Sequence, residues 1–138
     1  MKVTWSSTEV ICVDEELCKL EDVSQINYQQ IEHLNISVRV FILPCPLIAT
    51  GLKVLNIMHN YVESLTGVEK LVQLRTLKCG HNKIQNLHGI FDNLVHLEEL
   101  WLNSNRIELA ELSSLRPLAH LQTLILEPNP CCKEPMIK

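Results

Sequence analysis

The chain lacks the sequence features that mark most enzymes and most metal sites. Its 138 residues contain no glycine-rich phosphate loop, no nucleophile elbow and no carboxylate pair in a recognisable setting. Its 6 cysteines include no Cys-x-x-Cys pair, which argues against a structural metal site. We therefore expect no catalysis, no cofactor and no bound metal ion.

Aromatic residues and positive charge are also scarce. Aromatic residues make up 4% of the chain against 46% for hydrophobic residues, so its core has to be aliphatic. A formal net charge of -4 gives no electrostatic basis for direct binding of nucleic acid. The apolar run 40–52 is too short for a membrane span and contains Pro44 and Pro46. Because residues 1–9 lack a secretory signal, we expect a soluble protein of the cytoplasm, with the nucleus and the cilium as further locations.

A recurring frame of leucines is the main feature that the sequence does have. The frame reads leucine, two free positions, an aliphatic pair separated by one residue, two free positions and asparagine, as in 97–105. It returns at 52–60, 74–82 and 121–129, with Ile57 and Cys79 each replacing one leucine. Its middle leucines, Leu55, Leu77, Leu100 and Leu124, are 22, 23 and 24 residues apart. This period is typical of a leucine-rich repeat.

The spacing of the frame predicts where each side chain lies. Leu100 and Leu102 share one face of a short strand and point into the core, while Trp101 between them points the opposite way. The asparagine ends the strand, where its amide can bond the backbone of the turn. A single coil cannot bury its leucines alone, so neighbouring coils must stack. Stacking would place four asparagines in one column: Asn60, Asn82, Asn105 and Asn129.

These observations predict an α/β architecture of the leucine-rich-repeat type. We expect a right-handed solenoid with a parallel sheet on its concave face and irregular or short helical segments on its convex face. A single domain should cover 1–138 with about six repeats, degenerate over 1–51 and regular over 52–130. Val10 and Leu34 continue the frame towards the N-terminus, whereas 38–50 departs from it. The tail 131–138 has no recognisable cap, so this end is either truncated or covered by a partner.

Two stretches resemble repeats of the leucine-rich family that regulates type-1 protein phosphatase. They are 97–107 and 121–130, the second followed by Lys133 and Pro135. The same frame is similar to that of the spliceosomal A-prime protein and the axonemal dynein light chain. The resemblance implies a non-catalytic, protein-binding scaffold whose partner is the catalytic subunit of type-1 protein phosphatase. The alternatives that it leaves open are a structural adaptor in a ciliary, axonemal or cytoskeletal assembly and, third, a spliceosomal role.

The candidate binding residues occupy the outward positions of the strands and of the turns after them. Glu99 and Trp101 match the acidic and aromatic pair with which the resembled family binds its enzyme. An outward tryptophan also favours an interface, because tryptophan is enriched among binding hot spots. The predicted protein-binding residues are Val54, Met58, His59, Lys78, His81, Glu99, Trp101, Asn103, Ile125 and Glu127.

Two pairs of residues that include a histidine are candidates for metal binding or catalysis. His59 and His81 hold equivalent positions on adjacent strands, so their side chains should start about 5 Å apart. The next equivalent position is Ser104, so no third metal ligand is evident, and a role in recognition is the favoured interpretation. Cys79 and His81 are close in sequence, but strand alternation should place them on opposite faces. They therefore cannot act as a nucleophile and its base.

Overall fold

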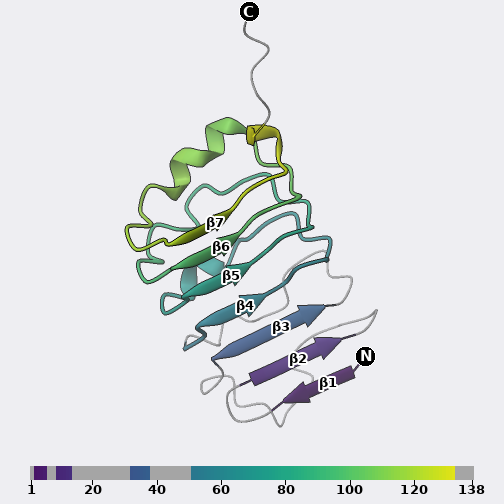
Figure 1. The fold of residues 1–138 in the computed structure, drawn as a ribbon. Coiled ribbons are helices and arrows are strands. Elements are labelled where there is room, and N and C mark those ends of the chain that lie inside the picture. The colour runs from purple at the N-terminus through teal and green to yellow at the C-terminus, as the bar shows by residue number, and fades with distance from the viewer. Residues whose placement is uncertain (1, 6–8, 14–31, 38–50, 133–138) are drawn as a thin grey trace, which may run out of the picture.

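A seven-stranded sheet organises the computed structural model (Figure 1). The structure describes residues 2–5, 9–13, 32–37 and 51–132, and the predictions made for 38–50 and for most of the tail lie outside them. The strands follow one another in chain order across the sheet. They are β1 (Lys2–Trp5), β2 (Glu9–Val13), β3 (His33–Ser37), β4 (Val54–Asn56), β5 (Thr76–Lys78), β6 (Glu99–Trp101) and β7 (Thr123–Ile125).

The register of the sheet confirms the frame. Strands β2 to β7 are parallel, and the middle position of each repeat pairs with the middle position of the next. The paired positions form one row: Val10, Leu34, Leu55, Leu77, Leu100 and Leu124. Strand β1 was not predicted from the sequence, and it pairs antiparallel with β2, from Lys2 opposite Val13 to Trp5 opposite Val10.

The core is aliphatic and lies directly behind the sheet. In the coil of β6, Leu97, Leu100 and Leu102 are fully buried, as the alternation predicts. A second layer of buried residues comes from the returning segments, and Phe91 is the largest fully buried side chain among the described residues. Burial of one such side chain contributes about 1.5–3 kcal/mol, so each coil depends on its neighbours to cover its leucines.

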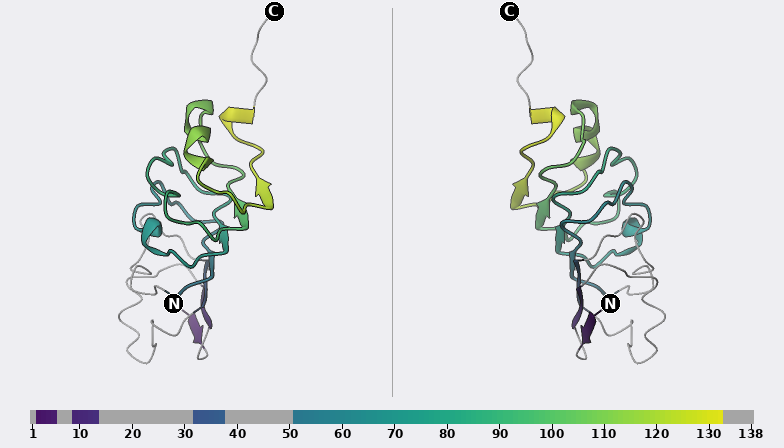
Figure 2. Two further views of the ribbon diagram at one scale, coloured as in Figure 1. Left: turned by 90° about the vertical axis from the view of Figure 1, so that its left-hand side faces the viewer. Right: turned by 90° about the vertical axis from the view of Figure 1, so that its right-hand side faces the viewer.

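The returning segments contain short 3₁₀ helices, which confirms the predicted short helical turns. They are η3 (Val68–Lys70), η4 (Leu109–Leu115) and η5 (Pro130–Cys132), and the described ranges contain no α-helix. Figure 2 shows η3 on the side of the coils away from the strands. Gly67 precedes η3 with a φ of 105°, a left-handed conformation in which a side chain would be strained. None of the helices in the described ranges is long and apolar enough to span a membrane.

The predicted asparagine column is present and joins the coils. The Nδ2 of Asn82 donates to the carbonyl of Cys79 in its own coil at 2.8 Å and to that of Ile57 in the preceding coil at 3.0 Å. Its Oδ1 accepts from the backbone N–H of Val62 at 3.1 Å. Asn105 and Asn129 repeat these bonds in the next two coils. Each of these side chains therefore satisfies backbone groups of two coils at once.

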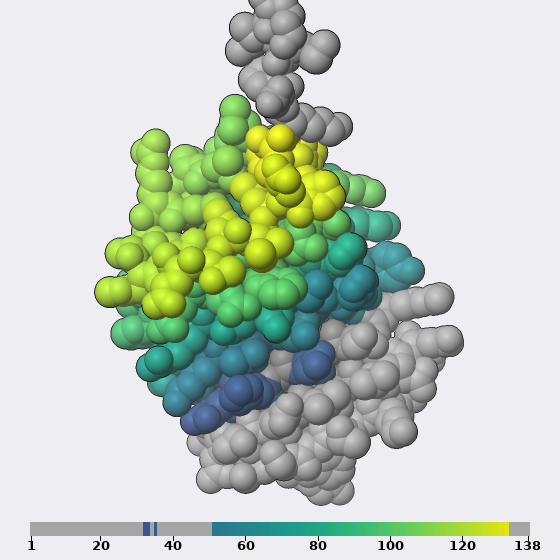
Figure 3. Space-filling model, in the orientation of Figure 1, coloured from purple at the N-terminus to yellow at the C-terminus, as the bar shows by residue number. Residues whose placement is uncertain are grey.

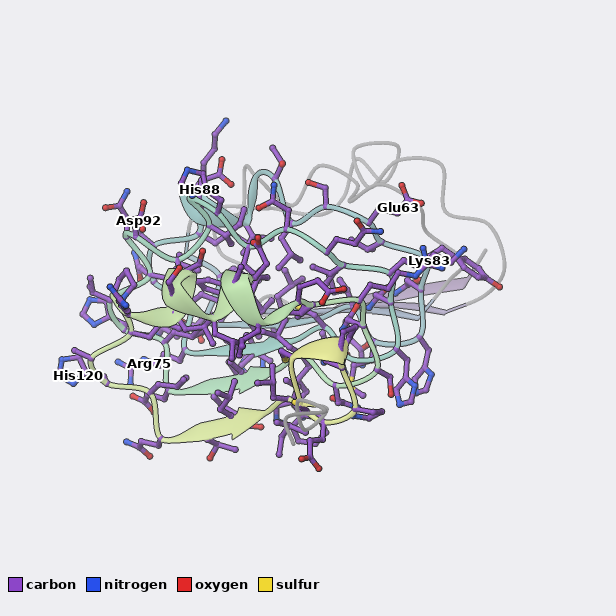
Figure 4. All side chains as sticks on the ribbon, turned by 90° about the horizontal axis from the view of Figure 1, so that it is seen from above. Glu63, Arg75, Lys83, His88, Asp92 and His120 are labelled. Carbon is purple, nitrogen blue, oxygen red and sulfur yellow. The ribbon has the colours of Figure 1, made fainter. Side chains whose placement is uncertain are left out.

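Side chains on the rim of the coils point away from the core. Seen along the stack of coils, the labelled His88, Asp92 and His120 extend outward (Figure 4), and all three are exposed. No described coil covers the outer side of β7. Leu124 is consequently 41% exposed, although it belongs to the same row as the fully buried Leu100.

Candidate functional site

The outward face of β4 to β7 and of the turns after them carries the predicted site residues, and we call it the concave face (Figure 3). Parallel pairing aligns its side chains in rows that run across the strands. One row contains Val54, Thr76, Glu99 and Thr123, and the next contains Asn56, Lys78, Trp101 and Ile125. The turns that follow add Met58, Gly80, Asn103 and Glu127, then His59, His81, Ser104 and Pro128.

Trp101 is half-buried and is fixed in place by two charged neighbours. Its Nε1 donates a hydrogen bond of 2.6 Å to the Oε2 of Glu99, which lies two residues earlier on the same face of β6. The Nζ of Lys78, the residue paired with Trp101 on β5, lies 4.8 Å from the ring centroid. Such a cation–π contact contributes about 0.5–1 kcal/mol at an exposed site. We call these three residues the Trp101 cluster.

An exposed apolar side chain extends the Trp101 cluster towards β7. Ile125 pairs with Trp101 and is 38% exposed. Val54 and Met58 lie on the same face but belong to the coil of β4, two coils from Trp101, and neither is the β4 residue that pairs with Lys78, so they lie outside the cluster. Of the predicted residues, Lys78, Glu99 and Trp101 therefore form one unit with Ile125 beside it.

Asn103, one of the predicted binding residues, packs against the backbone of the neighbouring coil. Its amide packs directly over Gly80, where an added Cβ would lie 2.6 Å from the Asn103 Oδ1. That oxygen is buried without a hydrogen-bond partner. The signal for this contact in the sequence was the glycine itself. The equivalent positions in the neighbouring coils carry larger side chains, and a glycine at such a position indicates that another group approaches the backbone closely.

His59 and His81 are stacked at the edge of the concave face. Their ring centroids are 4.3 Å apart and their planes differ by 11°. Both have left-handed backbone conformations, with φ values of 61° and 59°, and Ser104 continues the series at 57°. The described residues contain no group of three or more histidine, cysteine, aspartate or glutamate side chains that could hold a metal ion. The exposed pair therefore offers a flat, polar, aromatic surface at this edge.

Cys79 and His81 lie on opposite sides of the sheet, as predicted. Cys79 is fully buried in the core, whereas His81 is exposed. Burial raises the pKa of the Cys79 thiol far above its ordinary value. A protonated thiol in the core has neither the ionisation nor the access that a nucleophile needs.

A family model described as leucine-rich repeats, in two copies, matches residues 72–117. The chain contains leucine-rich repeats and has the leucine-rich-repeat fold. The matched range includes β5 and β6, and thus all three residues of the Trp101 cluster.

Two curated relatives illustrate what this chain is similar to. A protein named protein phosphatase 1 regulatory inhibitor subunit PPP1R7 homolog, from Arabidopsis thaliana, is 39% identical over 108 residues. That match covers 78% of this chain and 33% of the relative. Leucine-rich repeat-containing protein 23 from Bos taurus is 37% identical over 81 residues, which cover 58% of this chain and 24% of the relative. The chain thus spans a third or less of the length of these relatives.

Solved structures with the same fold include bacterial proteins. The internalin inlF of Listeria monocytogenes superposes with a TM-score of 0.69 at 20% identity, over 83% of this chain and 39% of that one. The internalin C2 of the same organism gives a TM-score of 0.62 at 29% identity, over 71% of this chain and 42% of that one. These superpositions support the solenoid fold of this chain.

Proposed function

We propose that this chain is a scaffold that binds another protein through its concave face and catalyses no reaction. The observation that carries the proposal is the Trp101 cluster. The indole N–H already bonds Glu99, and Lys78 lies over the ring, so the side chain is ordered before any partner arrives. Covering an ordered aromatic ring costs little additional conformational entropy, which is why such residues make effective binding anchors.

The preferred partner is the catalytic subunit of type-1 protein phosphatase. Two observations support this choice: the name of the Arabidopsis thaliana relative, and the acidic and aromatic pair Glu99 and Trp101, which the resembled family uses for binding. Glu127 adds a further exposed carboxylate beyond β7. We therefore expect the partner to present both an apolar and a basic surface to this end of the concave face.

A role without catalysis is supported by the positions of the reactive side chains. Cys79 is buried and faces away from His81, so these two residues cannot cooperate in attack on a substrate. The residues that the concave face does present, such as Trp101 and Ile125, are suited to contact and not to chemistry. This supports a binding scaffold.

A structural adaptor in a ciliary, axonemal or cytoskeletal assembly is the second candidate. Relatives named leucine-rich repeat-containing protein 23 from Bos taurus, Xenopus tropicalis and Homo sapiens are 37–38% identical to this chain, and their names mention no phosphatase. An adaptor would use the same concave face. Only the identity of the partner separates the two candidates.

Direct binding of the purified phosphatase catalytic subunit tests the proposal. We expect Trp101→Ala to raise the Kd by about 30-fold or more, which corresponds to the loss of about 2 kcal/mol at a hot spot. The matched control is Val95→Ala, which also removes exposed apolar surface but lies on a returning segment, and it should leave the Kd within about twofold.

The two parts of the proposal fail separately. If the wild-type chain does not bind the phosphatase subunit, the choice of partner is wrong. Recovery of tubulin or dynein chains by the wild-type protein, and their loss with Trp101→Ala, would then favour the adaptor. If the phosphatase binds and Trp101→Ala binds equally well with an unchanged circular dichroism spectrum, the concave face is the wrong surface.

A further inference from the structure

Two neighbouring thiols lie together at the end of η5. The Sγ atoms of Cys131 and Cys132 are 3.5 Å apart, and both residues are half-buried. Backbone hydrogen bonds fix both residues, because Cys131 N–H donates to the Ile107 carbonyl at 2.9 Å and Cys132 N–H donates to the Asn129 carbonyl at 3.0 Å. The backbone of the pair is therefore held in place, and the two sulfurs lie in contact.

The two thiols differ in their surroundings. Cys132 lines an open hollow of about 540 Å³ that it shares with Ser104, Glu127 and Pro128. Cys131 instead packs against the hydrophobic core. A small molecule that enters the hollow thus meets the sulfur of Cys132 first.

Electrostatics reinforces this difference. Burial raises the pKa of the Cys131 thiol to about 11, and its contact with Cys132 and the nearby charge of Glu108 act in the same direction. Since the thiolate is the nucleophile in thiol–disulfide exchange, Cys131 is poorly suited to make the first attack at neutral pH. It is well placed for a second attack on a sulfur that is already in contact with it.

We propose that Cys131 and Cys132 form a reversible thiol–disulfide exchange site that takes low-molecular-weight disulfides through this hollow. In the first step, the Cys132 thiolate attacks one sulfur of the small disulfide, a new S–S bond forms, and the other half leaves as a thiolate that takes up a proton. In the second step, the Cys131 sulfur loses its proton and attacks Cys132. The Cys131–Cys132 bond forms and the second half leaves as a thiol. The protein dithiol is oxidised by two electrons, and the small disulfide is reduced to two thiols.

The product should be easily reversed. Adjacent Cα atoms are about 3.8 Å apart across a trans peptide, whereas ordinary disulfides span about 4.4–6.8 Å. A bond between neighbouring cysteines is therefore strained, and strained disulfides are the labile ones that small thiols reduce. This behaviour fits an exchange site and not a structural cross-link.

One carboxylate in the lining of the hollow and a second one near Cys131 favour a cationic substrate. Glu127 lines the hollow, and Glu108 is close enough to Cys131 to act on its pKa. Both side chains are exposed carboxylates. They should attract a disulfide that carries ammonium groups, such as cystamine, and repel one with excess carboxylates, such as oxidised glutathione.

Peptide mapping of the full chain tests the proposal without any binding partner. The protein is treated with cystamine, quenched with N-ethylmaleimide and digested with trypsin, and residues 107–133 then form one peptide in which Cys131 and Cys132 are the only cysteines. We expect the wild-type peptide to lose two hydrogen atoms and to regain them with excess thiol. Cys131→Ser should stop at the mixed disulfide on Cys132, and Cys132→Ser should react at least about tenfold more slowly.

Three results would overturn the exchange site. The first is a wild-type peptide that carries only mixed disulfides. The second is a Cys132→Ser variant that reacts with cystamine as fast as the Cys131→Ser variant does, with both variants having the thermal unfolding midpoint of the wild type. The third is a faster reaction with oxidised glutathione than with cystamine, which would contradict the role of Glu108 and Glu127. Because phosphatase binding enters none of these readouts, failure here is distinguishable from failure of the proposed function.

Discussion

The contact between Gly80 and Asn103 allows a test in which one substitution changes the effect of another. A Cβ on Gly80 would lie 2.6 Å from the Asn103 Oδ1, which is too close for any two non-bonded heavy atoms of this kind. Gly80→Ala should therefore destabilise the protein by about 1 kcal/mol, the low end of the usual cost of overpacking, because the atoms in the way belong to the end of the Asn103 side chain and can shift.

Shortening Asn103 should remove that cost. Asn103→Ala eliminates the atoms that the new methyl group would meet, together with a buried oxygen that has no hydrogen-bond partner. Gly80 does not have a left-handed backbone. In the Asn103→Ala background, Gly80→Ala should therefore be neutral or stabilising by up to about 1 kcal/mol, because alanine reduces the entropy of the unfolded chain.

Urea unfolding of the four proteins, followed by circular dichroism, measures this coupling as a double-mutant cycle. Gly89→Ala is the matched control, because Gly89 has a φ of 76° and open space around its Cβ position. Its cost of about 1 kcal/mol comes from backbone strain and should be equal in both backgrounds. If Gly80→Ala costs the same with and without the Asn103 side chain, the packing argument is wrong.

The remaining predictions concern the core and the asparagine column. Asn82→Ala should lower the free energy of unfolding by about 1–3 kcal/mol, because it leaves the backbone N–H of Val62 unpaired and takes one hydrogen bond from each of two carbonyls, whereas the exposed Asn93→Ala should stay within about 0.5 kcal/mol in the same urea titration. Leu100→Asp should abolish the cooperative thermal melt, since it places an unpaired charge in the core; an unchanged melt would refute the frame. Burial raises the pKa of the Cys79 thiol, so iodoacetamide should label it at the rate of unfolding and not at the rate of a free thiol; rapid labelling in native conditions would contradict its inward position.

The sequence by itself determined the repeating geometry of this protein. Strand alternation and a period of 22–24 residues are local properties, so they predicted that Leu100 and Leu102 are buried and that Trp101 lies on the opposite side. The same reasoning predicted the row of paired strand positions and the asparagine column. Coils that share one repeat frame and stack on one another must align their equivalent positions.

The tertiary structure alone decided which side chains cooperate. The frame placed Glu99, Trp101 and Lys78 on one face, but only packing across β5 and β6 showed that the carboxylate and the ammonium group hold the indole. The antiparallel strand β1 carries no repeat frame, so periodicity could not predict it. The contact of Asn103 with Gly80 was missed for a related reason. Such contacts depend on the shapes and rotamers of side chains that are far apart in the chain. A repeat pattern specifies the position of each side chain, but not how different side chains at those positions pack together.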